Sequence, residues 1–132
     1  MRVIICLDDH NGIAFNNRRQ SRDRIVVDRT LQLSDGRPLR MSLYSAKLFP
    51  APAVLAGDDY LTAAGDEDFC FVELTDPAGF ATKIQELIVF RWNRVYPADV
   101  HLTLDLSQWK LVHTEEFPGH SHDKITMEVY GR

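Results

Sequence analysis

Val3-Ile4-Ile5-Cys6-Leu7 is the stretch on which the predicted fold depends, and the polar segment from Asp8 to Asp23 follows it directly. A continuous apolar run of this length is typical of a β-strand that is covered on both faces of its sheet. The segment from Arg22 to about Leu33 carries apolar residues at helical spacing and predicts a helix. We therefore expect a polar loop between the carboxyl end of a buried strand and a helix, which is where open α/β sheets bind ligands.

The start of the predicted helix carries candidate capping and ligand-binding side chains. We expect Ser21 to be the N-cap, because its hydroxyl can accept the free N–H groups of the first turn. Asp23 would then lie in the first turn, where the helix dipole favours a carboxylate. Four arginines lie in the loop and this first turn: Arg18, Arg19, Arg22 and Arg24. An alternative stays open, in which the loop is simply solvated and Asp23 only caps the helix and pairs with an arginine.

The charge of the chain is unevenly distributed. Residues 1–47 carry a formal charge of +4 and the remaining residues carry -8, which gives the net charge of -4. A protein with this balance is not expected to bind nucleic acid through a broad basic surface. The positive excess lies around the opening loop, so we expect an anionic ligand to be attracted there.

The rest of the chain predicts a single α/β domain over residues 1–132. After the first strand and helix, strands are predicted at 38–44, 53–56, 68–73, 87–92, 109–114 and 124–130, with an alternating segment at 99–104. Helices are predicted at 45–49 and 58–64, and another begins at Asp76-Pro77, where proline suits a first helical position. This order predicts a mixed, twisted sheet with helices on both faces, residues 3–7 at its centre and the last strands antiparallel.

Composition narrows the cellular setting and the role of cysteine. No apolar run approaches the roughly 18 residues that a membrane span needs, and no signal peptide is visible. We therefore expect a cytoplasmic protein without a membrane partner, and leave a homo-oligomer open. Cys6 and Cys70 both fall in predicted buried strands and are interpreted as core residues, as are Trp92 and Trp109.

Several motifs follow the order of those in one enzyme family. Gly12-Ile13, Asn17 and Asp23 follow the order of an opening loop and an acidic helix start. Tyr96–Leu102 and Leu106–Val112 lead to the final strand, which ends in Tyr130-Gly131-Arg132. In these features the chain resembles the dihydrofolate reductases, weakly in 34–75 and better in 1–25 and 77–132. The resemblance implies a dihydrofolate reductase-like fold, a site for a pterin-like ring, and, in a reductase, Asp23 as the residue that helps to protonate the substrate.

The departures from this family concern its cofactor and substrate sites. Leu74-Thr75-Asp76-Pro77 stands where the reductases have a Gly-Gly pair, so an N–H donor is lost and a negative charge is gained. Leu43–Lys47 replaces the cofactor turn after the second strand, and Pro50–Gly57 contains no arginine for a folate carboxylate. We therefore expect no cofactor, with NADPH binding weak or absent.

A short histidine-containing segment near the end of the chain resembles part of a metal site. Gly119-His120-Ser121-His122-Asp123 is similar to the His-x-His-x-Asp-His element of zinc-dependent hydrolases such as ribonuclease Z, but Lys124 follows where the last histidine would be. A catalytic zinc ion takes three protein ligands on a rigid frame. We therefore predict a solvated hairpin loop here and no metal site.

Three functional hypotheses remain from the sequence. The first is a protein that binds a small anionic or heterocyclic ligand, nucleotide-like or pterin-like, without ordinary reductase activity. The alternatives are a small NADPH-dependent reductase and a metal-dependent hydrolase or ribonuclease that uses His120 and His122. In the first hypothesis Asp23 accepts N–H bonds from a ring edge, and an arginine pairs with a phosphate or carboxylate. The predicted ligand-binding residues are Ile5, Cys6, Asn16, Asn17, Arg18, Arg19, Arg22, Asp23, Tyr44 and Ser45.

Overall fold

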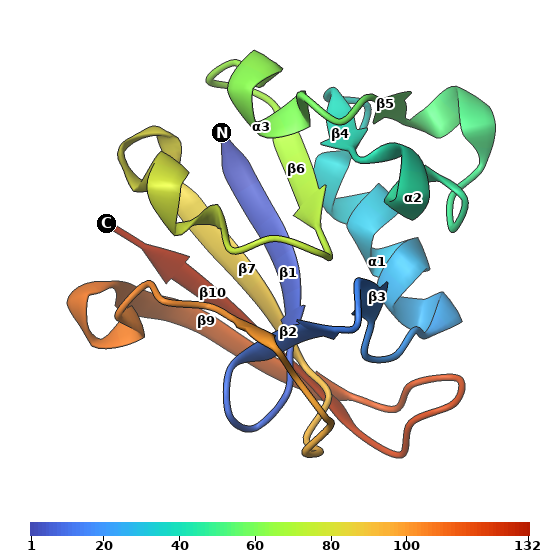
Figure 1. Ribbon diagram of the computed structural model, residues 1–132, viewed down its shortest axis with the longest axis vertical. Coiled ribbons are helices and arrows are strands. Elements are labelled where there is room, and N and C mark those ends of the chain that lie inside the picture. Colours follow the sequence, from blue (N-terminus) through green and yellow to red (C-terminus); the bar gives the residue numbers. More distant parts are fainter.

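Strand β1 (Arg2–Leu7) lies at the centre of a seven-stranded sheet in the computed structural model, which describes residues 1–132 (Figure 1). Its two neighbours, β6 (Phe69–Val72) and β7 (Glu86–Arg91), both run parallel to it. Because every residue from Val3 to Ile5 is fully buried, the strand is covered on both faces, as its continuous apolar sequence requires. The predicted central position of this strand is confirmed.

The outer strands complete the order β5-β4-β6-β1-β7-β10-β9. The short strands β4 (Leu39–Met41) and β5 (Leu55–Ala56) extend the parallel part beyond β6. On the other side, β10 (Ile125–Gly131) pairs antiparallel with both β7 and the edge strand β9 (Lys110–Phe117). The predicted antiparallel pairing of the last two strands is therefore confirmed.

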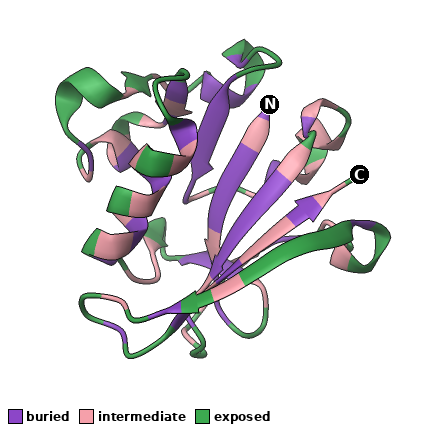
Figure 2. Cartoon of the chain, turned by 180° about the vertical axis from the view of Figure 1, so that it is seen from behind, coloured by how far each residue is buried: buried purple, intermediate pink, exposed green.

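One face of the sheet is covered mainly by helix α1 (Arg24–Ser34). Side chains alternate along β1, so Ile4 and Cys6 point to this face and Val3 and Ile5 point to the other. Helix α2 (Leu43–Ala46) and the 3-10 turn η1 (Ala51–Ala53) lie towards the β4–β5 end. Figure 2 shows how burial falls from β1 and β7 to the exposed edge strand β9.

The second face departs from the prediction of helices on both sides. Its only α-helix is α3 (Tyr60–Ala63), a single turn, and the helix predicted at Asp76-Pro77 is a 3-10 helix, η2 (Pro77–Lys83). Much of this face is covered instead by a second sheet, in the order β3-β2-β8, and by the segment around the 3-10 turn η3 (Leu106–Gln108). Short apolar segments can cover this face, because residues from each of them pack into one hydrophobic core cluster.

The polar segment after β1, which was predicted to be a loop, contains a β-hairpin. Strand β2 (Gly12–Phe15) pairs with β3 (Arg18–Arg19) and, on its other side, with β8 (Val100–His101). The two turn residues, Asn16 and Asn17, have φ angles of 52° and 58°. Consecutive left-handed residues are the requirement of a two-residue type I′ turn, and asparagine tolerates them well.

No helix of the chain combines the length and the apolar character that crossing a lipid bilayer demands.

Both termini lie at the same end of the strands of the large sheet, because Arg2 and Gly131 both pair with Glu86. The carboxyl ends of β1, β6 and β7 lie at the opposite end of the sheet, where several of the predicted ligand-binding residues come together.

Candidate functional site

Asp23 lies near the carboxyl ends of these strands and holds two segments of the chain together. It is the N-cap of α1, with its Oδ1 atom accepting the N–H of Ile25 at 2.9 Å. The prediction of Ser21 as the cap is therefore wrong. Ser21 lies too far before the first helical turn, and its hydroxyl contacts a histidine instead.

The Asp23 carboxylate also holds the loop between β9 and β10. The backbone N–H of His120 donates to Oδ1 and that of Ser121 donates to Oδ2, each at 2.9 Å, and Nδ1 of His122 lies 2.8 Å from Oδ2. No arginine forms an ion pair with it, in contrast to the alternative left open above. Burial alone would raise the pKa of Asp23, but the hydrogen bonds from His120, His122 and Ser121 lower it well below its ordinary value.

His122 is buried, which corrects the prediction of a solvated loop at residues 119–123. Only 7% of the residue is exposed, and its ring stacks on Trp92 with the centroids 4.5 Å apart. Its Nε2 atom lies 2.9 Å from Oγ of Ser21 and 3.4 Å from the hydroxyl of Tyr96. The loop folds inward because Asp23, itself buried, offers it an acceptor for two backbone N–H groups and one ring nitrogen. His120, Ser121 and Asp123 stay exposed.

Metal binding finds no support in this geometry. No three side chains of His, Cys, Asp or Glu come close enough together to hold a metal ion. His122 uses one ring nitrogen on Asp23 and faces Ser21 with the other. His120 is exposed.

A second buried carboxylate, Glu73, directly follows β6 and was not among the predicted site residues. It accepts both Nε and Nη2 of Arg19, at 2.8 and 3.0 Å, and the hydroxyl of Ser45 at 2.8 Å. The Arg19 guanidinium lies over the ring of Tyr44, 4.3 Å from its centroid. Burial and the nearby Glu73 carboxylate raise the pKa of the Cys6 thiol well above its ordinary value. An acidic residue at the end of a buried parallel strand was the sequence signal that could have identified Glu73.

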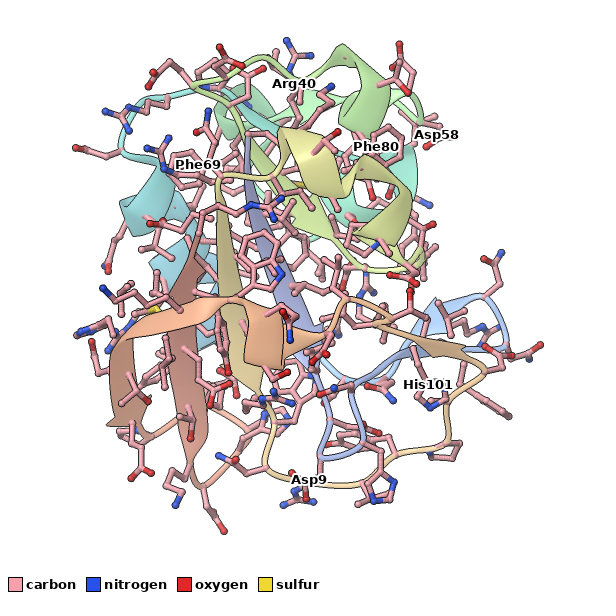
Figure 3. The ribbon with its side chains drawn as sticks, turned by 90° about the vertical axis from the view of Figure 1, so that its left-hand side faces the viewer. Asp9, Arg40, Asp58, Phe69, Phe80 and His101 are labelled. Atoms are coloured by element: carbon pink, nitrogen blue, oxygen red, sulfur yellow. The ribbon has the colours of Figure 1, made fainter.

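Two hollows open near the carboxyl ends of the parallel strands. The first, which we call the arginine hollow, measures about 310 Å³ and is lined by Arg22, Asp23, Arg24, Val27, Leu48, His120 and Ser121. The second, which we call the aspartate hollow, measures about 530 Å³ and is lined by Asn17, Ser42, Tyr44, Asp58, Asp59, Tyr60, Leu61, Thr62, Leu74, Thr75 and Phe80. Asp58 and Phe80 are labelled in Figure 3. Two cavities of about 10 Å³ lie near the arginine hollow, and both are lined by Cys6, Ser21, Glu73 and Trp92.

No protein-family model and no curated protein matches this chain.

The predicted site residues divide into groups in the structure. Cys6, Arg19, Tyr44 and Ser45 come together around Glu73. Arg22 lies with Asp23 on the wall of the arginine hollow.

The remaining predicted residues lie elsewhere. Ile5 is fully buried in the core on the opposite face from Cys6, so its inclusion was wrong: neighbouring strand residues point to opposite faces. Asn16, Asn17 and Arg18 are exposed in the β2–β3 hairpin, where only Asn17 lines a hollow.

The close approach of the β9–β10 loop to Asp23 depends on Gly119. A Cβ atom there would lie 2.6 Å from Oδ2 of Asp23 and 2.8 Å from the side chain of Ile125. We expect Gly119→Ala to lower the free energy of unfolding by about 2 kcal/mol, as overpacking of a buried contact does, measured by urea denaturation. Gly79→Ala is the matched control, because a Cβ there meets no atom within 4 Å. Equal stability of the two variants would contradict the tight fit.

Stability should fall in acid through Asp23. A carboxyl group whose pKa is lowered by folding contributes stability that is complete above its unfolded pKa and is lost as the pH falls towards the folded value. Because the unfolded pKa is about 3.9, we expect the free energy of unfolding to decrease below about pH 4. Urea denaturation from pH 7 to pH 3 measures this slope. Asp23→Asn should flatten it, and an unchanged slope in this variant would assign the acid sensitivity to other carboxyl groups.

Proposed function

We propose that the protein binds a small anionic ligand in the arginine hollow, on a divergent dihydrofolate reductase-like fold, and that it lacks ordinary reductase activity. One observation carries the proposal. Arg22 and Arg24 both line the hollow, and neither forms an ion pair with any carboxylate of the chain. A guanidinium group without a partner is well suited to hold a carboxylate or phosphate through two parallel hydrogen bonds.

The other walls of the arginine hollow define the rest of the ligand. Val27 and Leu48 supply apolar surface, and the exposed His120 and Ser121 add polar groups. A volume of about 310 Å³ is at the lower end of the range for small-molecule sites. These features favour a ligand with an anionic group and a compact apolar or heterocyclic body.

Asp23 has a different part in this proposal from the one expected from the sequence. Its two oxygens already accept from Ile25, His120, Ser121 and His122. Little acceptor capacity is left for the N–H edge of a ring. We therefore assign recognition of the ligand to the arginines and the positioning of the loop to Asp23.

The aspartate hollow argues against the reductase alternative. It is bordered by Tyr44, Leu74 and Thr75, from the two segments in which the chain departs from the reductases' cofactor motifs. Asp58 and Asp59 line it, and no lysine or arginine does. Carboxylates repel a pyrophosphate group, so this hollow is unsuited to NADPH.

The anion proposal can be tested with a fluorescent probe. Anilinonaphthalene sulfonate combines an anionic group with an apolar body, and inorganic phosphate should displace it. We expect Arg22→Gln and Arg24→Gln each to weaken probe binding about tenfold or more, the value of a lost charge-assisted hydrogen bond. Arg94→Gln, at an exposed arginine outside the hollow, is the control. An equal loss in this control, or no displacement by phosphate, would refute a specific anion site.

NADPH binding separates this proposal from the reductase alternative. We expect no saturation in a fluorescence titration up to about 100 μM NADPH, since binding with a dissociation constant in the micromolar range requires about -8 kcal/mol. The phosphate donors for such an affinity are missing from the aspartate hollow. A dissociation constant of a few micromolar would favour the reductase instead.

A further inference from the structure

We propose that Ser21, His122 and Asp23 form a catalytic triad for acyl transfer, in which Ser21 attacks the carbonyl carbon of a small anionic ester. The proposal rests on the proposed function, because the arginine hollow would hold the anionic part of this substrate. The triad would add a reaction at the carboxyl ends of the parallel strands, where the proposed function includes only binding.

The geometry is that of a nucleophile, a base and an orienting carboxylate. Oγ of Ser21 lies 2.9 Å from Nε2 of His122, and Nδ1 of the same ring lies 2.8 Å from Oδ2 of Asp23. Such triads are recognised by distances and roles and not by chain order, since they recur on unrelated folds. Ser21 and His122 are 101 positions apart, so the arrangement is not a product of local sequence.

Asp23 is held in the state that an orienting carboxylate needs. Its bonds to the N–H groups of Ile25, His120 and Ser121 favour the ionised form. An ionised Asp23 accepts a hydrogen bond from the N–H at Nδ1 of His122, which leaves Nε2 without a proton and able to accept that of Ser21. Stacking on Trp92 fixes the plane of the ring. Asp23 is thus a positioning residue, and Ser21 and His122 are the catalytic ones.

Ser21 is accessible from the side of the arginine hollow. It is partly exposed and lines a cavity of about 10 Å³ that shares Arg22, Asp23, Val27 and Leu48 with that hollow. A cavity of this size holds no more than about one water molecule, so the whole ester, its acetyl group included, would occupy the arginine hollow on the side of Ser21. The N–H of Arg22 forms no hydrogen bond within the chain and is available to the developing oxyanion.

Cys6 lines the same cavity but does not compete as the nucleophile. Its raised pKa keeps the thiol protonated, and the protonated form is a poor nucleophile. It also forms no hydrogen bond with His122, whose Nε2 atom faces Ser21. The base is therefore aimed at the serine.

The reaction balances with water as the only co-reactant. Oγ of Ser21 bonds to the carbonyl carbon while its proton passes to Nε2 of His122. The bond from that carbon to the leaving oxygen then breaks, and this oxygen takes the proton from Nε2. Water next attacks the acyl carbon and gives a proton to Nε2, the bond to Oγ breaks, and Oγ recovers the proton. The products are a carboxylic acid and an alcohol.

The test uses two short acetyl esters, acetylsalicylate, which is anionic, and 4-nitrophenyl acetate, which is neutral. We expect hydrolysis of both above the buffer rate, and labelling by phenylmethylsulfonyl fluoride on the peptide that contains Ser21. Ser21→Ala should lose at least 100-fold in kcat/KM, while Ser107→Ala, at an exposed serine on η3, should not change it. Asp23→Asn, assayed where circular dichroism shows it folded, should lower kcat, leave KM unchanged and alter the pH–rate profile.

Failure of the triad and failure of the anion site give different results. If Ser21→Ala keeps the full rate, or the label lies elsewhere, the triad is refuted whatever the anion probe shows. Arg22→Gln and Arg24→Gln should raise KM for acetylsalicylate much more than they raise KM for 4-nitrophenyl acetate. If both esters respond equally while Ser21→Ala is inactive, the triad stands and the arginine hollow is not its anion site.

Discussion

Replacing Asp23 by alanine should lower the free energy of unfolding by about 4 kcal/mol, because several donors lose one charged acceptor at the same time. Only 4% of Asp23 is exposed. Without its carboxylate, the backbone N–H groups of His120 and Ser121 and the ring of His122 lose their acceptor. Each buried donor left without a partner costs about 1–3 kcal/mol. Urea denaturation at neutral pH measures the loss.

Asp105→Ala is the matched control for this variant. Asp105 is also an aspartate N-cap, on η3, but it is exposed and bonds only to Ser107. Its loss should cost much less stability than the loss of Asp23, because only one exposed cap is removed. If the two variants lose the same stability, Asp23 is only a cap and the β9–β10 loop is held by other contacts.

Replacing Glu73 by alanine should lower the free energy of unfolding by about 3 kcal/mol, near the lower end for a broken buried ion pair. Arg19 would keep its charge beside Tyr44 with no carboxylate, and the hydroxyl of Ser45 would lose its acceptor. The 19% exposure of the Arg19 side chain lets water compensate part of the loss. Chemical denaturation at neutral pH measures this effect as well.

Glu67→Ala provides the comparison for Glu73→Ala. Glu67 pairs with Arg37 at 4.0 Å, and both side chains are more than half exposed. Such a surface pair contributes about 0–1 kcal/mol. A loss at Glu73 no larger than at Glu67 would mean that Arg19 finds another partner when the carboxylate is removed.

Local patterns were sufficient to predict the frame of the fold. The continuous apolar run of β1 predicted a central strand, and the alternation in β9 and β10 predicted an antiparallel pair at one edge. Each of these features is decided by the periodicity of a few consecutive residues. The β2–β3 hairpin could also have been predicted, because Asn16 and Asn17 carry the signal of its turn.

The candidate site could be predicted only in part, because its contacts join distant residues. Asp23 and Arg19 were both predicted site residues, yet their partners His122 and Glu73 were not. The polar composition of residues 119–123 is typical of a solvated loop, and only the position of Asp23 in space explains why His122 is buried. Composition describes a segment by itself, whereas burial depends on what packs against it.

The separation between Asp23 and its partners also bears on how the protein folds. The hydrogen bonds to His120, Ser121 and His122 span 97, 98 and 99 positions of the chain. Closing so long a loop carries an entropic cost, and contacts between distant residues slow the folding of a domain. During synthesis, His122 can meet Ser21 only after the segment up to residue 122 has left the ribosome. A truncated or unfinished chain would therefore carry the serine without its base.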